Sequence, residues 1–150
     1  MVSRRTFLQS LDTSAVEQAI ARAEARTSGE IRVSIAPFFV GSVRRMAEGA
    51  FRRLGMHATV RRNGVLLLIA PARRQVVVLG DEGIHAQVGD SFWTEIAARV
   101  STRFRERRFT EGVVEAVDAI GDALARHFPA STDGGGNPNE LPDTIDVGDR

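Results

Sequence analysis

Apolar residues recur along this chain with two distinct spacings. A spacing of three and four residues places side chains on one face of a helix, and it marks residues 13–27, 41–55, 90–105 and 110–127. The segment "EIRVSIAPF" follows the first of these and alternates like a strand, while "GVLLLIA" and "QVVVLG" are short apolar runs after the second. The pattern therefore predicts the element order αβαββαα.

The connections between these segments restrict the fold. A helix joins the first strand to the second, so we expect parallel strands with a right-handed crossover. Only "PARR" separates the second strand from the third, a length that allows only a hairpin. We therefore expect an α/β fold: a three-layer, Rossmann-like α/β/α sandwich with a small mixed sheet and about four helices.

The strand sequences also predict how deeply each strand is buried. The second and third strands are continuous apolar runs, which are typical of strands covered on both faces. The first strand alternates between apolar residues and Arg32 or Ser34, which predicts one face less buried than the other.

All of this periodicity lies in residues 1–129, which we expect to form a single domain. From Ala130 the chain reads "ASTDGGGNPNELPDTIDVGDR", with few large apolar residues and several acidic ones. This composition predicts a flexible acidic tail over residues 130–150. The chain contains no cysteine, which excludes disulfides, thiolate zinc sites and cysteine-based phosphatase chemistry.

The formal net charge of +1 hides a basic body and an acidic tail. Arginines occur in adjacent pairs, at positions 4–5, 44–45, 52–53, 61–62, 73–74 and 107–108. Such pairs can meet acidic lipid or protein surfaces, but for most of them we prefer the simpler interpretation that they solvate helix faces and loop ends. We do not expect nucleic-acid binding, because tyrosine is absent, no nucleic-acid-reading motif occurs and the tail is acidic.

The stretch "SRRTFLQS" is similar to a twin-arginine export signal. The apolar region that such a signal needs does not follow, because the next residues are charged and helix-periodic. No run approaches the roughly 20 apolar residues that span a membrane. We expect a soluble monomer, cytoplasmic or peripheral to a membrane, without a signal peptide or transmembrane helix.

One edge of the predicted sheet gathers polar residues. The first two strands begin there and the third ends there, so "SGE", "RRN" and "GDEG" converge. Oxygen donors of this kind suit Ca²⁺, with Mg²⁺ as the alternative. The candidate metal ligands are Glu30, Asn63, Asp81, Glu82 and Asp90.

Asp81 and Glu82 are also the candidate catalytic residues at this edge. A metal held there could bind a phosphate oxygen and activate a water molecule, and Arg61 or Arg62 could clamp the phosphate. The alternative is structural: "GDEG" can form a turn in which Asp81 bonds to the backbone and the glycines adopt positive φ. The pattern alone favours the turn.

Four segments together resemble the TPM domain family over about residues 7–129: "TSGEIRVSI", "RNGVLLLIAP", "VLGDEGIHAQVGDSFW" and "FTEGVVEAVDAIGDALARHFP". The tail segment "NELPD" is similar to a short, stand-alone bacterial branch of that family. The resemblance implies a Rossmann-like α/β/α sandwich. Some members are described as acid phosphatases, some bind calcium, and others are linked to assembly of membrane complexes in photosynthesis and respiration.

Two functions follow from these observations and the resemblance. We favour an interaction or assembly factor for membrane protein complexes of the respiratory type, with a candidate divalent-metal site. The alternative is a metal-dependent acid phosphatase that acts on phosphomonoesters. The partners expected for the favoured function are a membrane protein complex or its assembly factors.

Overall fold

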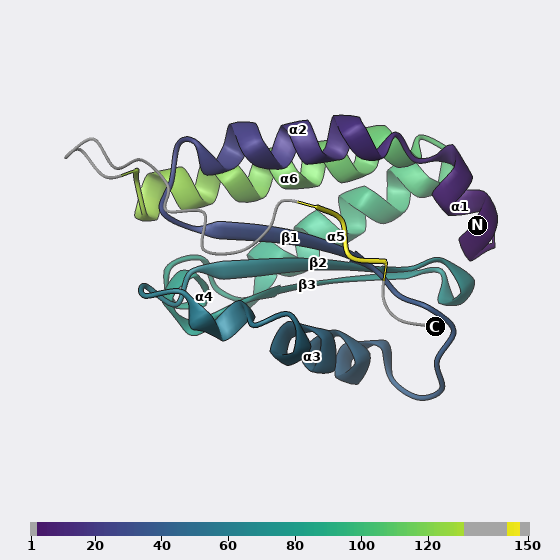
Figure 1. The fold of residues 1–150 in the computed structure, drawn as a ribbon, viewed down its shortest axis with the longest axis horizontal. Coiled ribbons are helices and arrows are strands. Elements are labelled where there is room, and N and C mark those ends of the chain that lie inside the picture. Colours follow the sequence, from purple (N-terminus) through teal and green to yellow (C-terminus); the bar gives the residue numbers. More distant parts are fainter. Residues whose placement is uncertain (1–2, 131–143, 148–150) are drawn as a thin grey trace.

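The computed structural model describes residues 3–130 and 144–147. Six helices and three strands follow one another in these residues (Figure 1). They are α1 (Arg4–Ser10), α2 (Thr13–Glu24), β1 (Glu30–Ile35), α3 (Val43–Arg53), β2 (Gly64–Ala70), β3 (Gln75–Gly80), α4 (Glu82–Val88), α5 (Asp90–Arg105) and α6 (Phe109–His127). Two 3₁₀ turns, η1 (Met56–Ala58) and η2 (Pro71–Arg73), flank β2.

The sheet has the order β1-β2-β3, with β1 and β2 parallel and β2 and β3 antiparallel. Helices α2, α5 and α6 cover one face and α3 covers the other, so the sheet lies between two helical layers (Figure 1). The predicted α/β/α sandwich and its strand directions are confirmed. The four predicted helices correspond to α2, α3, α5 and α6.

Burial follows the position of each strand in the sheet. The central strand β2 is buried at all seven positions. Strand β3 is an edge strand and is mostly half-buried, so the expectation that both its faces are covered is wrong. The face of β1 that carries Arg32 and Ser34 is slightly less buried than the other, as expected, because Arg32 is half-buried while Ile31, Val33 and Ile35 are buried. β1 and β3 are both edge strands, and β1 is the more buried of the two because residues 144–147 lie along its edge.

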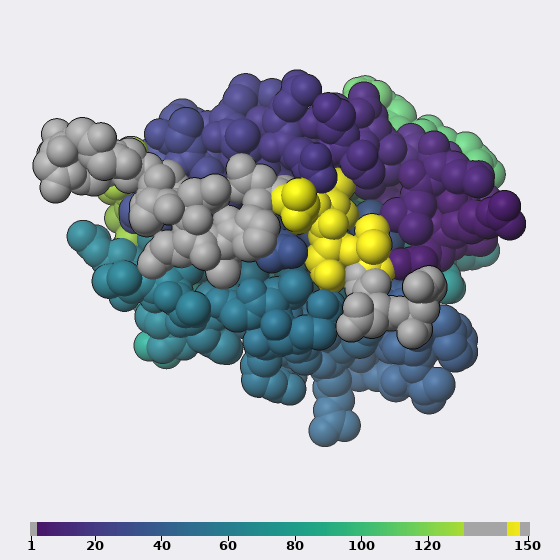
Figure 2. Space-filling model, in the orientation of Figure 1, coloured from purple at the N-terminus to yellow at the C-terminus, as the bar shows by residue number. Residues whose placement is uncertain are grey.

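Part of the predicted tail lies against β1. Residues 144–147 run along its free edge, where Asp146 forms a parallel bridge with Ser34. Ile145 packs on the main core, which explains why a weakly apolar segment settles there. Figure 2 shows this segment between α2 and the layer of α3. Flexibility was predicted for all of residues 130–150, of which 131–143 and 148–150 lie outside the described residues.

Two seven-residue helices were not predicted. The stretch that resembles an export signal forms α1, where the Ser3 hydroxyl accepts a hydrogen bond from the Thr6 N–H. Phe7 is fully buried there, with ring centroids 5.3 Å from those of Phe104 and Phe109. The "GDEG" motif begins α4 rather than a turn. None of the described helices combines the length and the apolar character that crossing a membrane requires.

Candidate functional site

The predicted convergence at one end of the sheet is confirmed. Glu30 lies opposite Gly64, and Val65 lies opposite Gly80. The Asp81 N–H donates a hydrogen bond to the Gly64 carbonyl at 2.9 Å. The starts of β1 and β2 and the end of β3 therefore share one rim.

Asp81 is the buried centre of this rim. Its side chain is 3% exposed and caps α4, accepting a hydrogen bond from the Glu82 N–H at 2.9 Å. Arg62 binds both carboxylate oxygens, through Nε at 2.6 Å and Nη2 at 2.9 Å. His57 Nδ1 lies 3.1 Å from the same carboxylate. Both oxygens of Asp81 are thus committed to groups of this chain.

The electrostatics of Asp81 agree with this arrangement. Burial on its own would raise the pKa of the carboxyl group, but other effects outweigh it. Hydrogen bonds from Arg62 and the Glu82 amide, together with the charges of His57 and Arg62, hold the Asp81 pKa below its usual value. An ionised carboxylate of low pKa is poorly suited to act as a general acid at neutral pH. The catalytic role of Asp81 and Glu82 stays a prediction.

Arg62 serves as an internal partner in this structure rather than as an open phosphate clamp. Its backbone is left-handed, with φ of 53°, a conformation that non-glycine residues seldom adopt. Three contacts hold it there: the fork on Asp81, an Nη1 contact to Glu82 Oε1 at 3.3 Å, and a 2.8 Å bond from the Gly83 N–H to its carbonyl. Arg61 is exposed beside it.

The glycines of "GDEG" have a packing role instead of the predicted turn role. Neither Gly80 nor Gly83 has positive φ. A Cβ on Gly80 would lie 2.3 Å from the Trp93 ring, and one on Gly83 would lie 2.2 Å from the Arg61 carbonyl oxygen. Glycine is needed at both positions because the neighbouring atoms leave no room for a side chain.

The predicted metal ligands do not fit a calcium or magnesium site as they are placed. Asp81 is held by Arg62, and Asp90 points to His85 at 3.3 Å. Asn63 Oδ1 is buried and unpaired among the described residues, as an oxygen ligand would be, while Nδ2 donates to Ser28. Yet no three His, Asp or Glu side chains within residues 3–130 and 144–147 are grouped to hold a metal. The calcium prediction stays a prediction.

A second polar network lies where α4 meets α5, and sequence analysis did not find it. The Trp93 indole N–H donates to His85 Nδ1 at 3.0 Å, while His85 Nε2 lies 3.3 Å from Asp90 Oδ1. Because an indole N–H can only donate, Nδ1 must accept, and Nε2 carries the proton toward Asp90. Gly89, with φ of 79°, turns the chain between the helices and brings the three side chains together. No residue spacing indicates this turn.

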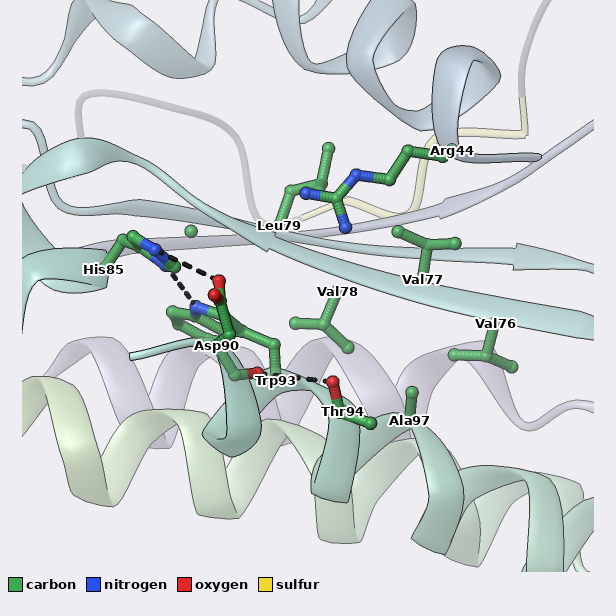
Figure 3. A pocket seen from close by; sticks show the side chains of 11 residues that line it. Arg44, Val76, Val77, Val78, Leu79, His85, Asp90, Trp93, Thr94 and Ala97 are labelled. Carbon is green, nitrogen blue, oxygen red and sulfur yellow. Dashed lines mark hydrogen bonds and ion pairs between the residues drawn. The ribbon is translucent and has the colours of Figure 1, made fainter. Parts of the chain in front are cut away.

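This network closes one end of a groove of about 400 Å³ along β3 (Figure 3). Strand β3 forms the floor, from Val76 to Gly80. One wall comes from α5, with Trp93, Thr94 and Ala97, and Arg44 of α3 lies on the other side.

The backbone of β3 opens into this groove. In an antiparallel pair, residues alternate between bonding to the partner strand and turning their N–H and C=O groups outward. Asp81 bonds to Gly64, so Leu79, Val77 and Gln75 bond to β2. The intervening residues, Val76, Val78 and Gly80, therefore turn their backbone groups toward the groove.

These features define an α/β/α sandwich whose sheet has one edge closed by the chain itself and one edge lining a groove. The family model described as the TPM domain matches residues 1–123. The chain belongs to the TPM domain family. No curated protein matches the sequence.

Solved structures show the same fold. The NMR structure of BA42 protein from the psychrophilic bacterium Bizionia argentinensis is 36% identical, with a TM-score of 0.81 over 91% of this chain and 92% of that one. An N-terminal domain from P. gingivalis has a TM-score of 0.62 at 20% identity, covering 74% of each chain. The N-terminal domain of cg2496 from Corynebacterium glutamicum has a TM-score of 0.57 at 16% identity, covering 74% of this chain and 70% of that one.

Proposed function

We propose that this protein is an interaction module that binds an extended segment of a partner protein along the free edge of β3. The observation that carries the proposal is the orientation of Val76, Val78 and Gly80, whose backbone groups face the groove. An added strand satisfies such groups with main-chain hydrogen bonds, which is a common mode of peptide recognition. An open edge of this kind is otherwise a liability that proteins cover.

The opposite edge of the same sheet supports this interpretation. There the outward Ile31 N–H donates to Glu24 Oε2 at 2.7 Å. The Ile35 N–H donates to the Asp146 carbonyl at 2.8 Å, and the Asp146 N–H donates to the Val33 carbonyl at 2.9 Å. An extended segment thus already adds to β1. The groove offers a partner segment the equivalent place on β3.

The walls of the groove define the chemistry of the segment. Side chains of an added strand alternate between the two faces of the sheet. Those on the α5 side meet Thr94 and Ala97, which leave room for small apolar groups. Those on the α3 side meet Arg44, an exposed arginine whose Nε is 3.5 Å from Glu48. We therefore infer a segment with small apolar residues on one side and a carboxylate on the other.

The source of the segment is the finer part of the proposal. Other TPM-domain proteins are linked to assembly of membrane complexes, so a subunit or assembly factor of a respiratory-type complex is the partner class that we propose. Disordered segments that fold on binding can take the extended form that the groove requires.

A display experiment tests the edge directly. Random peptides displayed on phage are selected on the intact protein, and the enriched peptides are synthesised and titrated. We expect Val76→Pro to remove binding, because proline has no N–H to offer the added strand, while an edge strand tolerates it. We expect Arg44→Glu to weaken acidic peptides, and Arg45→Glu on the same helix to leave them unchanged. Failure to enrich any peptide, or equal binding to Val76→Pro, would contradict the proposal.

Phosphomonoester hydrolysis remains the second candidate because of one contact. Asp81 lies 3.1 Å from Nδ1 of His57, whose ring is half exposed, so a buried carboxylate orients an accessible imidazole. Sequence analysis did not select His57. Hydrolysis of p-nitrophenyl phosphate by the purified protein tests this candidate. Loss of hydrolysis in His57→Gln but not in His127→Gln would support the phosphatase candidate. Equal rates of hydrolysis in the two variants would rule it out.

A further inference from the structure

The loop between β1 and α3 carries apolar side chains into solvent. Phe38 is 82% exposed and Val40 is 88% exposed. Between them Phe39 turns inward and packs on the core beneath α3. In Figure 1 the chain leaves β1, swings out beyond the end of the sheet and returns to enter α3.

The loop is held in this position by arginine. Arg73 Nη2 donates to the Gly41 carbonyl at 2.7 Å, and the Arg73 guanidinium lies 4.9 Å from the centre of the Phe39 ring. Arg4 Nε donates to the Ala36 carbonyl at 3.0 Å. The inward ring and both ends of the loop are therefore fixed, and this leaves Phe38 and Val40 as an apolar tip.

The surroundings of the tip are strongly basic. Three segments meet at this end of the sheet, residues 3–11, 36–47 and 69–76, and none contains an aspartate or glutamate. They contribute six arginines: Arg4, Arg5, Arg44, Arg45, Arg73 and Arg74. Asp12 directly follows the first segment and caps α2. Glu48 pairs with Arg44, and Asp146 pairs with Arg53.

We propose that this loop docks the protein on an anionic lipid bilayer, with Phe38 and Val40 entering the interface and the arginines meeting lipid headgroups. A convex tip fits a bilayer, which needs no complementary pocket. Apolar insertion and arginine attraction to anionic lipid add to each other. Arg44 also lines the β3 groove, but Phe38, Val40 and the other five arginines do not, so the docking can be tested separately from the proposed function.

The topology gives the docked protein an orientation. Strands β1 and β2 end at the loop, whereas Val60, Arg61 and Asp81 lie at the other end of the sheet. The strands then point toward the membrane, and the β3 groove runs from the bilayer surface toward the rim. A partner segment that emerges from the membrane can enter the groove at Val76.

Vesicle flotation tests the docking. Vesicles of phosphatidylcholine alone are compared with vesicles that contain equal parts of phosphatidylcholine and phosphatidylglycerol. We expect binding only to the second kind, decreasing as salt is raised. We expect Phe38→Ser to reduce vesicle binding about tenfold, because the variant lacks the large apolar side chain that moves from water into the bilayer interface. Arg74→Glu weakens binding as well, while Val60→Ser and Arg61→Glu at the far end do not.

A labelling experiment locates the contact without relying on lost binding. The chain has no cysteine, so Val40→Cys and Val60→Cys each give one labelled site. Val60 is 85% exposed and is the matched control. An environment-sensitive dye at position 40 should shift to the blue on phosphatidylglycerol vesicles, and the same dye at position 60 should not. No binding of the wild type, or equal shifts at both positions, would overturn the proposal.

Discussion

The Asp146 carboxylate accepts a hydrogen bond from the Ser34 hydroxyl at 2.8 Å. The two residues are far apart in sequence, but they lie side by side at the edge of the sheet. The backbone of Asp146 pairs with both neighbours of Ser34, and Arg53 Nη2 lies 2.9 Å from its carboxylate. The chain thus closes the edge of β1 with its own residues. The edge of β3 lines the groove instead, and it is the edge to which we propose that a partner segment adds.

Replacing Asp146 should loosen the segment that closes β1. Asp146→Ala removes the contacts to Ser34 and Arg53, and we expect the free energy of unfolding to fall by about 1 kcal/mol. Hydrogen exchange should accelerate at the Ile35 amide, which donates to Asp146. Asp118→Ala, on the exposed side of α6, is the control and should change neither. Unchanged exchange at Ile35 would show that the segment does not close this edge.

Asp81 should stabilise the fold in a pH-dependent way. Its folded-state pKa is lowered, so its contribution is present above the ordinary aspartate pKa of about 4 and is lost as the pH falls through the lower folded value. At neutral pH we expect Asp81→Asn to cost about 2 kcal/mol, with a smaller difference from wild type below about pH 4.

Urea denaturation over a series of pH values measures this difference. Asp90→Asn is the matched control, because the Asp90 side chain is almost fully exposed. A cost of Asp81→Asn that stays constant down to acid pH would contradict the pairing of Asp81 with Arg62.

Two glycine substitutions should have opposite effects. Gly83→Ala places a Cβ 2.2 Å from the Arg61 carbonyl oxygen, and a displaced backbone should cost about 3 kcal/mol or prevent folding. Gly49→Ala places a Cβ within α3 where no atom lies within 4 Å. Alanine favours the helix, so stability should rise by about 0.5–1 kcal/mol. Thermal unfolding of both variants measures the two changes in stability. Equal changes for Gly83→Ala and Gly49→Ala would contradict the close packing at Gly83.

Long periodic segments made most of the fold predictable. Residues 90–105 and 110–127 bury regular stripes, and the two short runs around "PARR" could only form a hairpin. Helix α4 was missed because it buries one residue, Ile84, which is too few to show a period.

The rim was predictable in part, and the groove was not. Topology alone brings Asp81 near residues 61–63, but the pairing of Asp81 depends on the left-handed backbone of Arg62, which carries no sequence signal. The sequence of β3 resembles that of β2, although one is an edge strand and the other is central. The sequence pattern of a strand shows how apolar it is, but it does not show whether the strand lies at the centre or at the edge of the sheet.

Hydrogen exchange at β3, measured with and without a display-selected peptide, tests the central claim most directly. The account predicts slower exchange at Val76, Val78 and Gly80, whose N–H groups face the groove. Val77 and Leu79 should change little, because they already bond to β2. Unaltered exchange at Val76 and Val78 in the peptide complex, or slowing confined to the rim residues Arg61, Arg62 and Asp81, would contradict strand addition at this edge.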